Sequence, residues 1–168
     1  MRQYVFQPQL SESDAWGVIE DRLPQVAKIA AELRHHPFSG FVHRIYCDMK
    51  DRSLGDEVHT LVDRYTGQAY LTAAWPRLDE LPESSEIGKV ADPGWNSVSF
   101  EQARQLAMQL LRTATMRRLR LLRRQAPEEK QGFELIWKPN WVLTGRHSDQ
   151  ELKILVDGLS GSYYVIGS

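Results

Sequence analysis

The fold of this chain is most constrained by a short motif that occurs twice. Residues 61–67 read Leu-Val-Asp-Arg-Tyr-Thr-Gly, and residues 155–161 read Leu-Val-Asp-Gly-Leu-Ser-Gly. An Asp carboxylate can accept hydrogen bonds from backbone N–H groups further along a turn, and glycine supplies a positive φ where the chain reverses. We therefore expect structural turns built on four residues, Asp63, Gly67, Asp157 and Gly161. Two Asp residues poised at a functional site are the alternative interpretation.

Each copy of the motif comes after a helix signal. Ser11 with Asp14, and Ser99 with Gln102, have the spacing of a capping box, in which a serine caps the helix and the residue three positions later bonds back to it. Apolar residues at helical spacing then predict one helix from 11 to about 34 and another from 99 to about 125. Pro24 falls inside the first and is expected to kink it.

Alternating apolar and polar residues predict several short strands in both halves. The Gly-Phe pairs at 40–41 and 132–133 are expected to lie where strands begin. The predicted strands are 3–7, 41–49, 58–64, 68–75, 132–138, 141–145, 151–157 and 162–167.

The order of these elements predicts an α+β fold made of two pseudo-repeated halves. Each half, 1–75 and 98–168, has one helix and an antiparallel meander, and a proline-rich, acidic linker or loop at 76–97 separates them. The amphipathic helices and the alternating strands both favour a sheet with the two helices packed on one face. We expect one compact domain.

The second half resembles the PepSY-type repeat, in which a helix precedes a meander that ends in an Asp-containing turn. The resemblance is carried by Ser99-Phe100-Glu101-Gln102-Ala103 with Ala107, and by the turn motif at 155–161. The first half matches the same pattern more weakly. The resemblance implies a tandem α/β repeat with a ligand-binding or protease-regulating role outside the cell or at its surface.

Composition argues against several other classes of protein. The net charge of −1 over 168 residues gives no overall attraction to nucleic acid, so we expect no nucleic-acid partner. Cys47 is the only cysteine, which excludes an internal disulfide and zinc sites made of two or four cysteines. The start of the chain has no apolar h-region, and no window approaches 18 apolar residues. We therefore expect no membrane span and a cytoplasmic location, most simply in a bacterium.

No catalytic motif stands out in the sequence. There is no His-Glu-x-x-His, no Gly-x-Ser-x-Gly and no phosphate-binding glycine loop. His43 and His59 could meet across neighbouring strands, but spacing provides no third metal ligand. We therefore expect no metal, no cofactor and no enzymatic activity.

Two features point instead to recognition of a protein or peptide. Trp137 and Trp141 alternate onto one side of a predicted strand, where they form either core or an exposed contact patch. Five arginines fall on one side of the second helix: Arg112, Arg117, Arg120, Arg123 and Arg124. They are either solvated, paired with the acidic 76–97 segment, bound to an acidic protein partner, or bound to nucleic acid or anionic lipid.

The leading hypothesis is a non-catalytic binding or regulatory module, of which an inhibitor or immunity-type protein is one form. The alternative is a small-molecule-binding or enzymatic protein with a pocket between sheet and helices. The sequence leaves homo-oligomerisation open.

The arginine surface can be tested by charge reversal. Replacing Arg117→Glu together with Arg120→Glu is expected to abolish binding of a recovered protein partner while the melting temperature stays unchanged, because solvated charges contribute little to stability. Binding is measured by calorimetry and unfolding by circular dichroism. A lower melting temperature with intact binding would instead assign these arginines to the acidic 76–97 segment.

Overall fold

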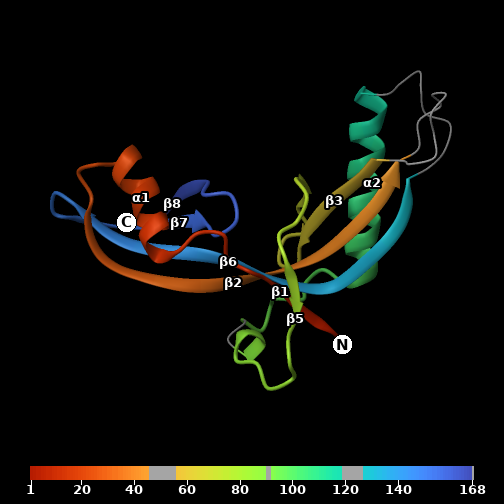
Figure 1. Cartoon of the computed structure of the whole chain (residues 1–168), viewed down its shortest axis with the longest axis horizontal. Coiled ribbons are helices and arrows are strands. Elements are labelled where there is room, and N and C mark those ends of the chain that lie inside the picture. The colour runs from red at the N-terminus through yellow and green to blue at the C-terminus, as the bar shows by residue number, and fades with distance from the viewer. Residues whose placement is uncertain (46–55, 90–91, 119–126, 168) are drawn as a thin grey trace. The chain divides into compact units, whose positions relative to one another are not determined.

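The computed structural model describes residues 1–45, 56–89, 92–118 and 127–167 of an α+β protein, mostly strand with two helices (Figure 1). This confirms the predicted α+β class. Its elements are β1 (Gln3–Phe6), α1 (Glu12–Arg22), β2 (Ala27–Ile45), β3 (Asp56–Asp63), β4 (Ala69–Thr72), β5 (Leu78–Glu80), a 3-10 turn (Ile87–Lys89), α2 (Phe100–Arg118), β6 (Glu128–His147), β7 (Gln150–Asp157) and β8 (Tyr163–Gly167). Strand pairing follows the order β4-β3-β2-β6-β1-β5, and β7 pairs with β6 and with β8.

The chain divides into two compact units, each of which contains segments from both halves of the sequence. Residues 1–4, 37–75 and 80–136 form the first unit, which contains α2, β3 and β4. The second unit contains α1, β7 and β8 and is formed by residues 5–36, 76–79 and 137–168. The long strands β2 and β6 each give one part of their length to each unit.

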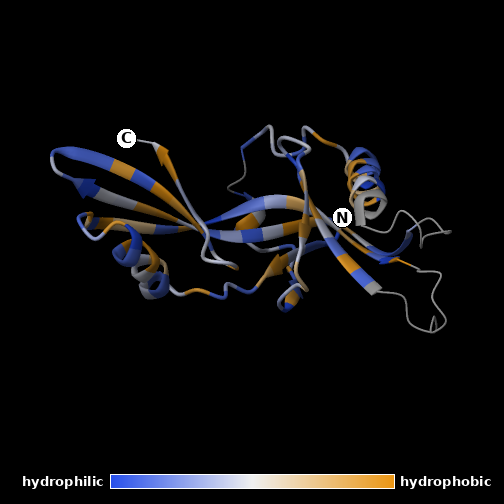
Figure 2. Cartoon of the chain, turned by 90° about the horizontal axis from the view of Figure 1, so that it is seen from above, coloured by the Kyte–Doolittle hydropathy of each residue, from blue (hydrophilic) through white to orange (hydrophobic). Residues whose placement is uncertain are grey.

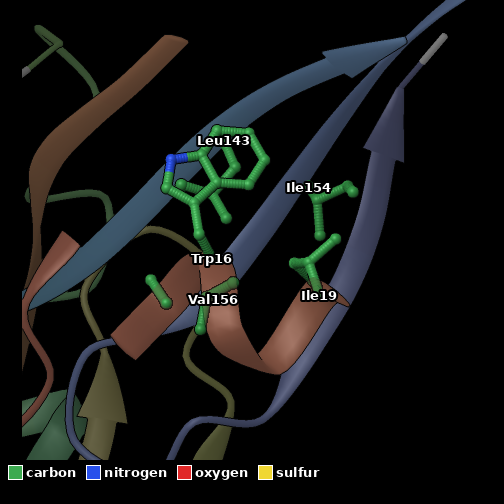
Figure 3. Packing of buried hydrophobic residues seen from close by; sticks show 6 residues of the cluster. Trp16, Ile19, Leu143, Ile154 and Val156 are labelled. Carbon is green, nitrogen blue, oxygen red and sulfur yellow. The ribbon is translucent and has the colours of Figure 1, made fainter. Parts of the chain in front are cut away.

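Each helix packs on strands from the other half of the sequence. In the first unit, Ala103 and Ala107 of α2 are buried in one cluster with Phe41 of β2 and Val62 of β3. In the second unit, α1 directs Trp16 and Ile19 onto Leu143 of β6 and onto Ile154 and Val156 of β7 (Figure 3). The sequence halves therefore exchange their helices.

The first helix is shorter than the sequence predicted. α1 ends at Arg22, and its C-cap Leu23 leaves the helical region with φ −133° and ψ 68°. Leu23 precedes Pro24, whose ring disfavours a helical conformation at the residue before it. Residues 27–34, expected to be helical, belong to β2 instead. The capping box of Ser11 and Asp14 is present as predicted.

The second helix begins as expected, with Ser99 and Gln102 exchanging capping hydrogen bonds of 2.8 and 3.1 Å. The structure describes α2 as far as Arg118, so its predicted extension to 125 lies outside the described residues. The same holds for residues 46–49 at the end of the predicted strand 41–49.

The two Gly-Phe pairs do not start strands, because both lie inside the long strands β2 and β6. A Cβ on Gly40 would meet the side chain of Ile136 and would lie 2.7 Å from the Trp75 ring, so glycine allows this close packing. The predicted break near Pro139 is also absent. Pro139 continues β6 in an extended conformation that its fixed φ permits, and its carbonyl accepts a hydrogen bond of 3.0 Å from the Gly158 N–H.

The 76–97 segment is not simply a linker, because part of it joins the sheet as β5 beside β1. The N–H of Leu81 donates to the Gln3 carbonyl at 2.8 Å. Two acidic residues of the 76–97 segment form ion pairs within it: Asp79 with Arg77 at 2.7 Å and Glu86 with Lys89 at 2.7 Å.

The two copies of the repeated motif form turns with the same hydrogen bonds. The Asp63 carboxylate accepts from the N–H groups of the second and third residues after it, at 2.7 and 3.2 Å, and the Asp157 carboxylate does the same at 2.8 and 3.2 Å. Gly67 and Gly161 close the turns with φ of 77° and 76°. Both carboxylates therefore hold a backbone reversal that sets where the next strand begins.

Loss of either carboxylate should destabilise its unit. Asp63→Ala and Asp157→Ala are each expected to lower the free energy of unfolding by about 0.5–2 kcal/mol, by analogy with the loss of a helix cap. Asp→Asn keeps an oxygen acceptor and should retain most of the stability. Urea titrations of the four variants measure the difference. An alanine variant that kept full stability but lost a binding activity would contradict the structural role.

Candidate functional site

The most exposed apolar residues of the second unit lie on β8, an edge strand. Tyr164, Val165 and Ile166 are 63%, 54% and 51% exposed. Among the described residues, β8 pairs with β7 alone, so its other edge carries backbone groups with no neighbouring strand. Figure 2 shows the hydrophobic colouring of this strand near the C-terminus. An open edge with apolar side chains is an uncommon combination in a folded protein.

The register with β7 places apolar side chains on both faces of β8. Tyr163 lies opposite Val156, and Val165 lies opposite Ile154. Val156 and Ile154 are buried beneath α1, so Tyr163 and Val165 point to the α1 side, since paired residues share a face. Tyr164 points to the opposite side. A segment pairing with β8 would therefore meet apolar side chains above and below its backbone.

The same register shows which backbone groups of β8 are available. The Asp157 N–H donates to the Ser162 carbonyl at 2.8 Å, so this pair is hydrogen-bonded. Hydrogen-bonded and non-hydrogen-bonded pairs alternate in an antiparallel ladder. The N–H groups of Tyr163 and Val165 therefore point away from β7, toward the open edge, whereas the Tyr164 N–H points to β7.

The start of β8 is held in place by the turn that precedes it. Lys138 forms an ion pair with the Asp157 carboxylate, and both side chains are only 17% exposed. Tyr163 packs on the buried residues between α1 and strands β6 and β7, which we call the α1 cluster (Ala15, Trp16, Ile19, Leu143, Ile154 and Val156). The Trp141 indole N–H donates to the Leu10 carbonyl at 3.0 Å. A fixed strand loses little conformational entropy when a partner pairs with it.

A second surface feature is an open pocket of about 490 Å³ beside α1, lined by Glu12, Ser13, Trp16, Lys28, Ile29 and Ala30. The Lys28 ammonium lies 5.7 Å from the centre of the Trp16 ring and pairs with Glu20. Pockets for small ligands usually bury most of the ligand surface. This one is open to solvent and has its cation already paired.

The predicted arginine surface is described only in part. Arg112 is exposed on α2. The side chain of Arg117, and Arg120, Arg123 and Arg124 altogether, lie outside the described residues. Arg104, which the sequence analysis did not single out, donates to Glu129 at 2.9 Å and also pairs with Glu101. These hydrogen bonds raise the pKa of Arg104 above its usual value.

Trp137 cannot belong to a contact patch, because its side chain is only 1% exposed. Its neighbours in β6, Ile136 and Leu135, are buried as well, so this part of the strand is covered on both faces. Trp141 is half-buried against the α1 cluster. Trp137 is therefore a core residue and not part of a contact surface, whereas a partner-binding role for half-buried Trp141 stays a prediction.

A buried arginine organises the first unit. Arg64 is only 4% exposed, and its guanidinium donates to the carbonyls of Val98 and Glu134 at 2.7 and 2.8 Å. It also donates to the Ser39 hydroxyl at 3.2 Å and lies 5.3 Å from the Trp95 ring. Burial lowers the pKa of Arg64, and the Glu134 charge opposes that shift; arginine nevertheless stays protonated at neutral pH. These bonds attach the segment before α2 to β2 and β6.

The histidines do not form a metal site in the part of the chain that the structure describes. His43 pairs with Val58, whereas His59 pairs with Val42, so the two imidazoles point to opposite faces of the sheet. The described residues contain no group of three or more His, Cys, Asp or Glu side chains placed to hold a metal ion. No helix in the described ranges is long and apolar enough to cross a membrane. Cys47 lies outside those ranges.

Comparison with protein families, curated proteins and solved structures gave no match. The resemblance to PepSY-type repeats therefore stays a prediction.

Sequence analysis placed a strand at 162–167 but did not mark it as an interaction site. The signal was present: residues 163–166 read Tyr-Tyr-Val-Ile, an apolar run with no charge or proline to protect an edge.

Removing the buried guanidinium should destabilise the first unit. Arg64→Met keeps an apolar chain of similar length but leaves the Val98 and Glu134 carbonyls without this donor. We expect the free energy of unfolding to fall by about 2–4 kcal/mol. Arg64→Lys should lower the free energy of unfolding by less, because lysine keeps the positive charge although it lacks the planar guanidinium with its several N–H donors. Denaturant titration measures both, with Arg34→Met on an exposed arginine as the control that should change little. Equal stability of all three variants would contradict the role of Arg64.

Proposed function

We propose that this chain is a non-catalytic protein- or peptide-binding module that recognises an extended segment of its partner along the edge of β8. The observation that carries the proposal is the exposure of Tyr164, Val165 and Ile166 on a strand whose outer edge is open. Addition of a strand to an open sheet edge is a recurrent way of binding peptides, in which main-chain hydrogen bonds give affinity and side chains give selectivity. An inhibitor or immunity-type protein is one form of such a module.

The first argument is the cost of leaving this edge uncovered. Natural proteins protect edge strands with lysine, proline, bulges or a covering loop, because an open apolar edge pairs with other chains. Residues 163–167 contain no charged residue and no proline. The register shift between Lys153 and Ile154 affects only the end of the β7–β8 pairing. An occupant would hydrogen-bond the outward N–H groups of Tyr163 and Val165 and cover the apolar side chains.

The second argument concerns the chemistry of that occupant. Because β8 carries no charge, it offers apolar contact and backbone hydrogen bonds rather than ion pairs. Tyr164 on one face and Val165 on the other would contact alternate side chains of a bound strand. The partner segment is therefore expected to be extended, with apolar or aromatic residues on both of its faces.

The proposal includes an internal structural repeat. The two sequence halves have the same element order, the same serine capping boxes and matching Asp-Gly turns. Each unit combines one helix with a hairpin from the opposite half. Superposition of α1, β7 and β8 on α2, β3 and β4 in an experimental structure would test the repeat; a different strand order would reject it.

The five arginines at 112–124 remain a second proposed surface, for an acidic protein partner; the side chain of Arg112 is exposed on α2. A cytoplasmic location belongs to the proposal too. The alternative function, small-molecule binding, is favoured by the pocket at Trp16 and Lys28. A thermal-shift screen with small molecules would support it, because a ligand of the folded state raises the melting temperature.

Blocking the outer edge of β8 should weaken peptide binding without unfolding the protein. Val165→Pro removes an N–H that points away from β7, so no hydrogen bond to β7 is lost, and proline is tolerated on edge strands. Peptides selected against the full chain from a random display library should bind this variant about tenfold more weakly or worse, because one main-chain hydrogen bond is lost and the ring obstructs the edge. Fluorescence anisotropy measures the affinity.

Two matched variants make this test specific. Val165→Thr keeps the N–H and a β-branched side chain, and it should retain the affinity. Tyr164→Pro removes an N–H that bonds to β7, and it should lower the melting temperature. Selected peptides that bind the wild type, Val165→Thr and Val165→Pro equally well would reject the edge as the binding surface. Sedimentation velocity separates peptide binding from pairing between two copies of the chain, which would appear as a concentration-dependent dimer.

A further inference from the structure

His43 is a fully buried histidine whose imidazole has no hydrogen-bond partner among the residues that the structure describes. Its exposed fraction is 0%, and neither Nδ1 nor Nε2 bonds to any described residue. Buried polar groups in folded proteins are almost always paired, so an orphaned imidazole requires an explanation. The established packing of the first unit does not use either nitrogen. The residue therefore costs stability in its neutral form and would cost more if it were charged.

His43 lies on the face of β2 against which α2 packs. It comes two residues after Phe41, so both side chains point to the same face, with ring centres 6.1 Å apart. Phe41 packs on Ala103 and Ala107 of α2 and stacks with Phe100 at 5.5 Å. Because His43 is fully buried, water reaches the imidazole only when the structure around it opens.

The charges around His43 come from three elements. On β6, Glu129 is close enough to act on the imidazole, but it accepts a hydrogen bond of 2.9 Å from Arg104 of α2. Among the described side chains of α2, the other charged ones are Glu101, which also pairs with Arg104, and Arg112, which is exposed. On β3, Glu57 pairs with Arg44 on the opposite face of the sheet.

These neighbours do not stabilise a protonated imidazole. Burial lowers the pKa of His43 from its ordinary value of 6.5, and the charge of Glu129 opposes but does not reverse this shift. A histidine whose pKa is lower in the folded state binds fewer protons there than in the unfolded state. The contribution of neutral His43 to the free energy of unfolding is therefore fully present above pH 6.5. It is lost as the pH falls toward the lower pKa that His43 has in the folded state.

We propose that His43 is an acid-sensitive latch, which holds α2 against β2, β3 and β4 while its imidazole is neutral and releases the helix when it is protonated. The proton enters only in an opened state in which the ring is hydrated, so acid increases the population of that state. Release of α2 uncovers Phe41 and Val62, an apolar surface that is closed at neutral pH. This device is separate from the β8 edge, which belongs to the other unit.

Hydrogen exchange of the full chain between pH 7.5 and pH 5.0 tests the latch. After correction for intrinsic exchange rates, the opening constant of the α2 amides should rise by up to about tenfold per pH unit below 6.5 in the wild type. His43→Leu has no titrating group at this position, and its α2 amides should show no such dependence. His147→Gln, on an exposed histidine of β6, should behave as the wild type does. The β7 amides provide an internal reference that should not change.

A second measurement keeps the proposal testable if His43→Leu does not fold. In the wild-type chain labelled at histidine, nuclear magnetic resonance reports the protonation of the His43 ring directly. The latch requires His43 to titrate below 6.5, with α2 opening over the same pH range. Titration at or above 6.5 with α2 still protected would show that Glu129 accepts the charged ring in place, which overturns the proposal. Equal pH dependence in the wild type and in His43→Leu overturns it as well.

Discussion

The packing of each helix on strands from the opposite half of the sequence is the constraint on which the rest of the structure depends. α1 can bury Trp16 and Ile19 only against Leu143, Ile154 and Val156, and α2 can bury Ala103 and Ala107 only against Phe41 and Val62. A helix with one apolar face needs such a partner surface, because burial of that face supplies most of its stability. The long strands β2 and β6 make the exchange feasible, since each one contributes to both units.

Elements specified by local chemistry could be predicted from the sequence, whereas those that depend on distant contacts could not. The capping boxes at Ser11 and Ser99 and the turns at Asp63 and Asp157 involve atoms within a few residues of one another, and their geometry follows from residue type. The conformation of residues 27–34 does not follow from residue type. Their apolar positions suit a helix, but Pro24 ends α1 and pairing along β2 then favours an extended chain. Tertiary context overrides local preference here.

The same limit applies to the candidate site. Whether Trp137 or Val165 faces solvent depends on which strands lie beside them, and alternation alone does not specify that. Trp137 lies in an interior strand and is buried; β8 lies at an edge and remains exposed. Buried polar residues were also missed, because Arg64 lies within a motif that has the pattern of a simple turn. Its guanidinium donates three hydrogen bonds, whereas the imidazole of His43 in the same unit bonds to no described residue. Satisfied buried groups fix a structure, and unsatisfied ones leave it sensitive to conditions.

The interleaving of the two units has a consequence for how the chain can fold during synthesis. α1 leaves the ribosome well before the strands that cover its apolar face, because those strands, β6 and β7, come much later in the sequence. Until those strands are made, Trp16 and Ile19 have no native surface to bury against. Contacts so distant in sequence close slowly, and exposed apolar segments are prone to aggregate in the meantime. The nascent chain is therefore expected to depend on chaperones, and early truncation should leave a first half that cannot complete either core.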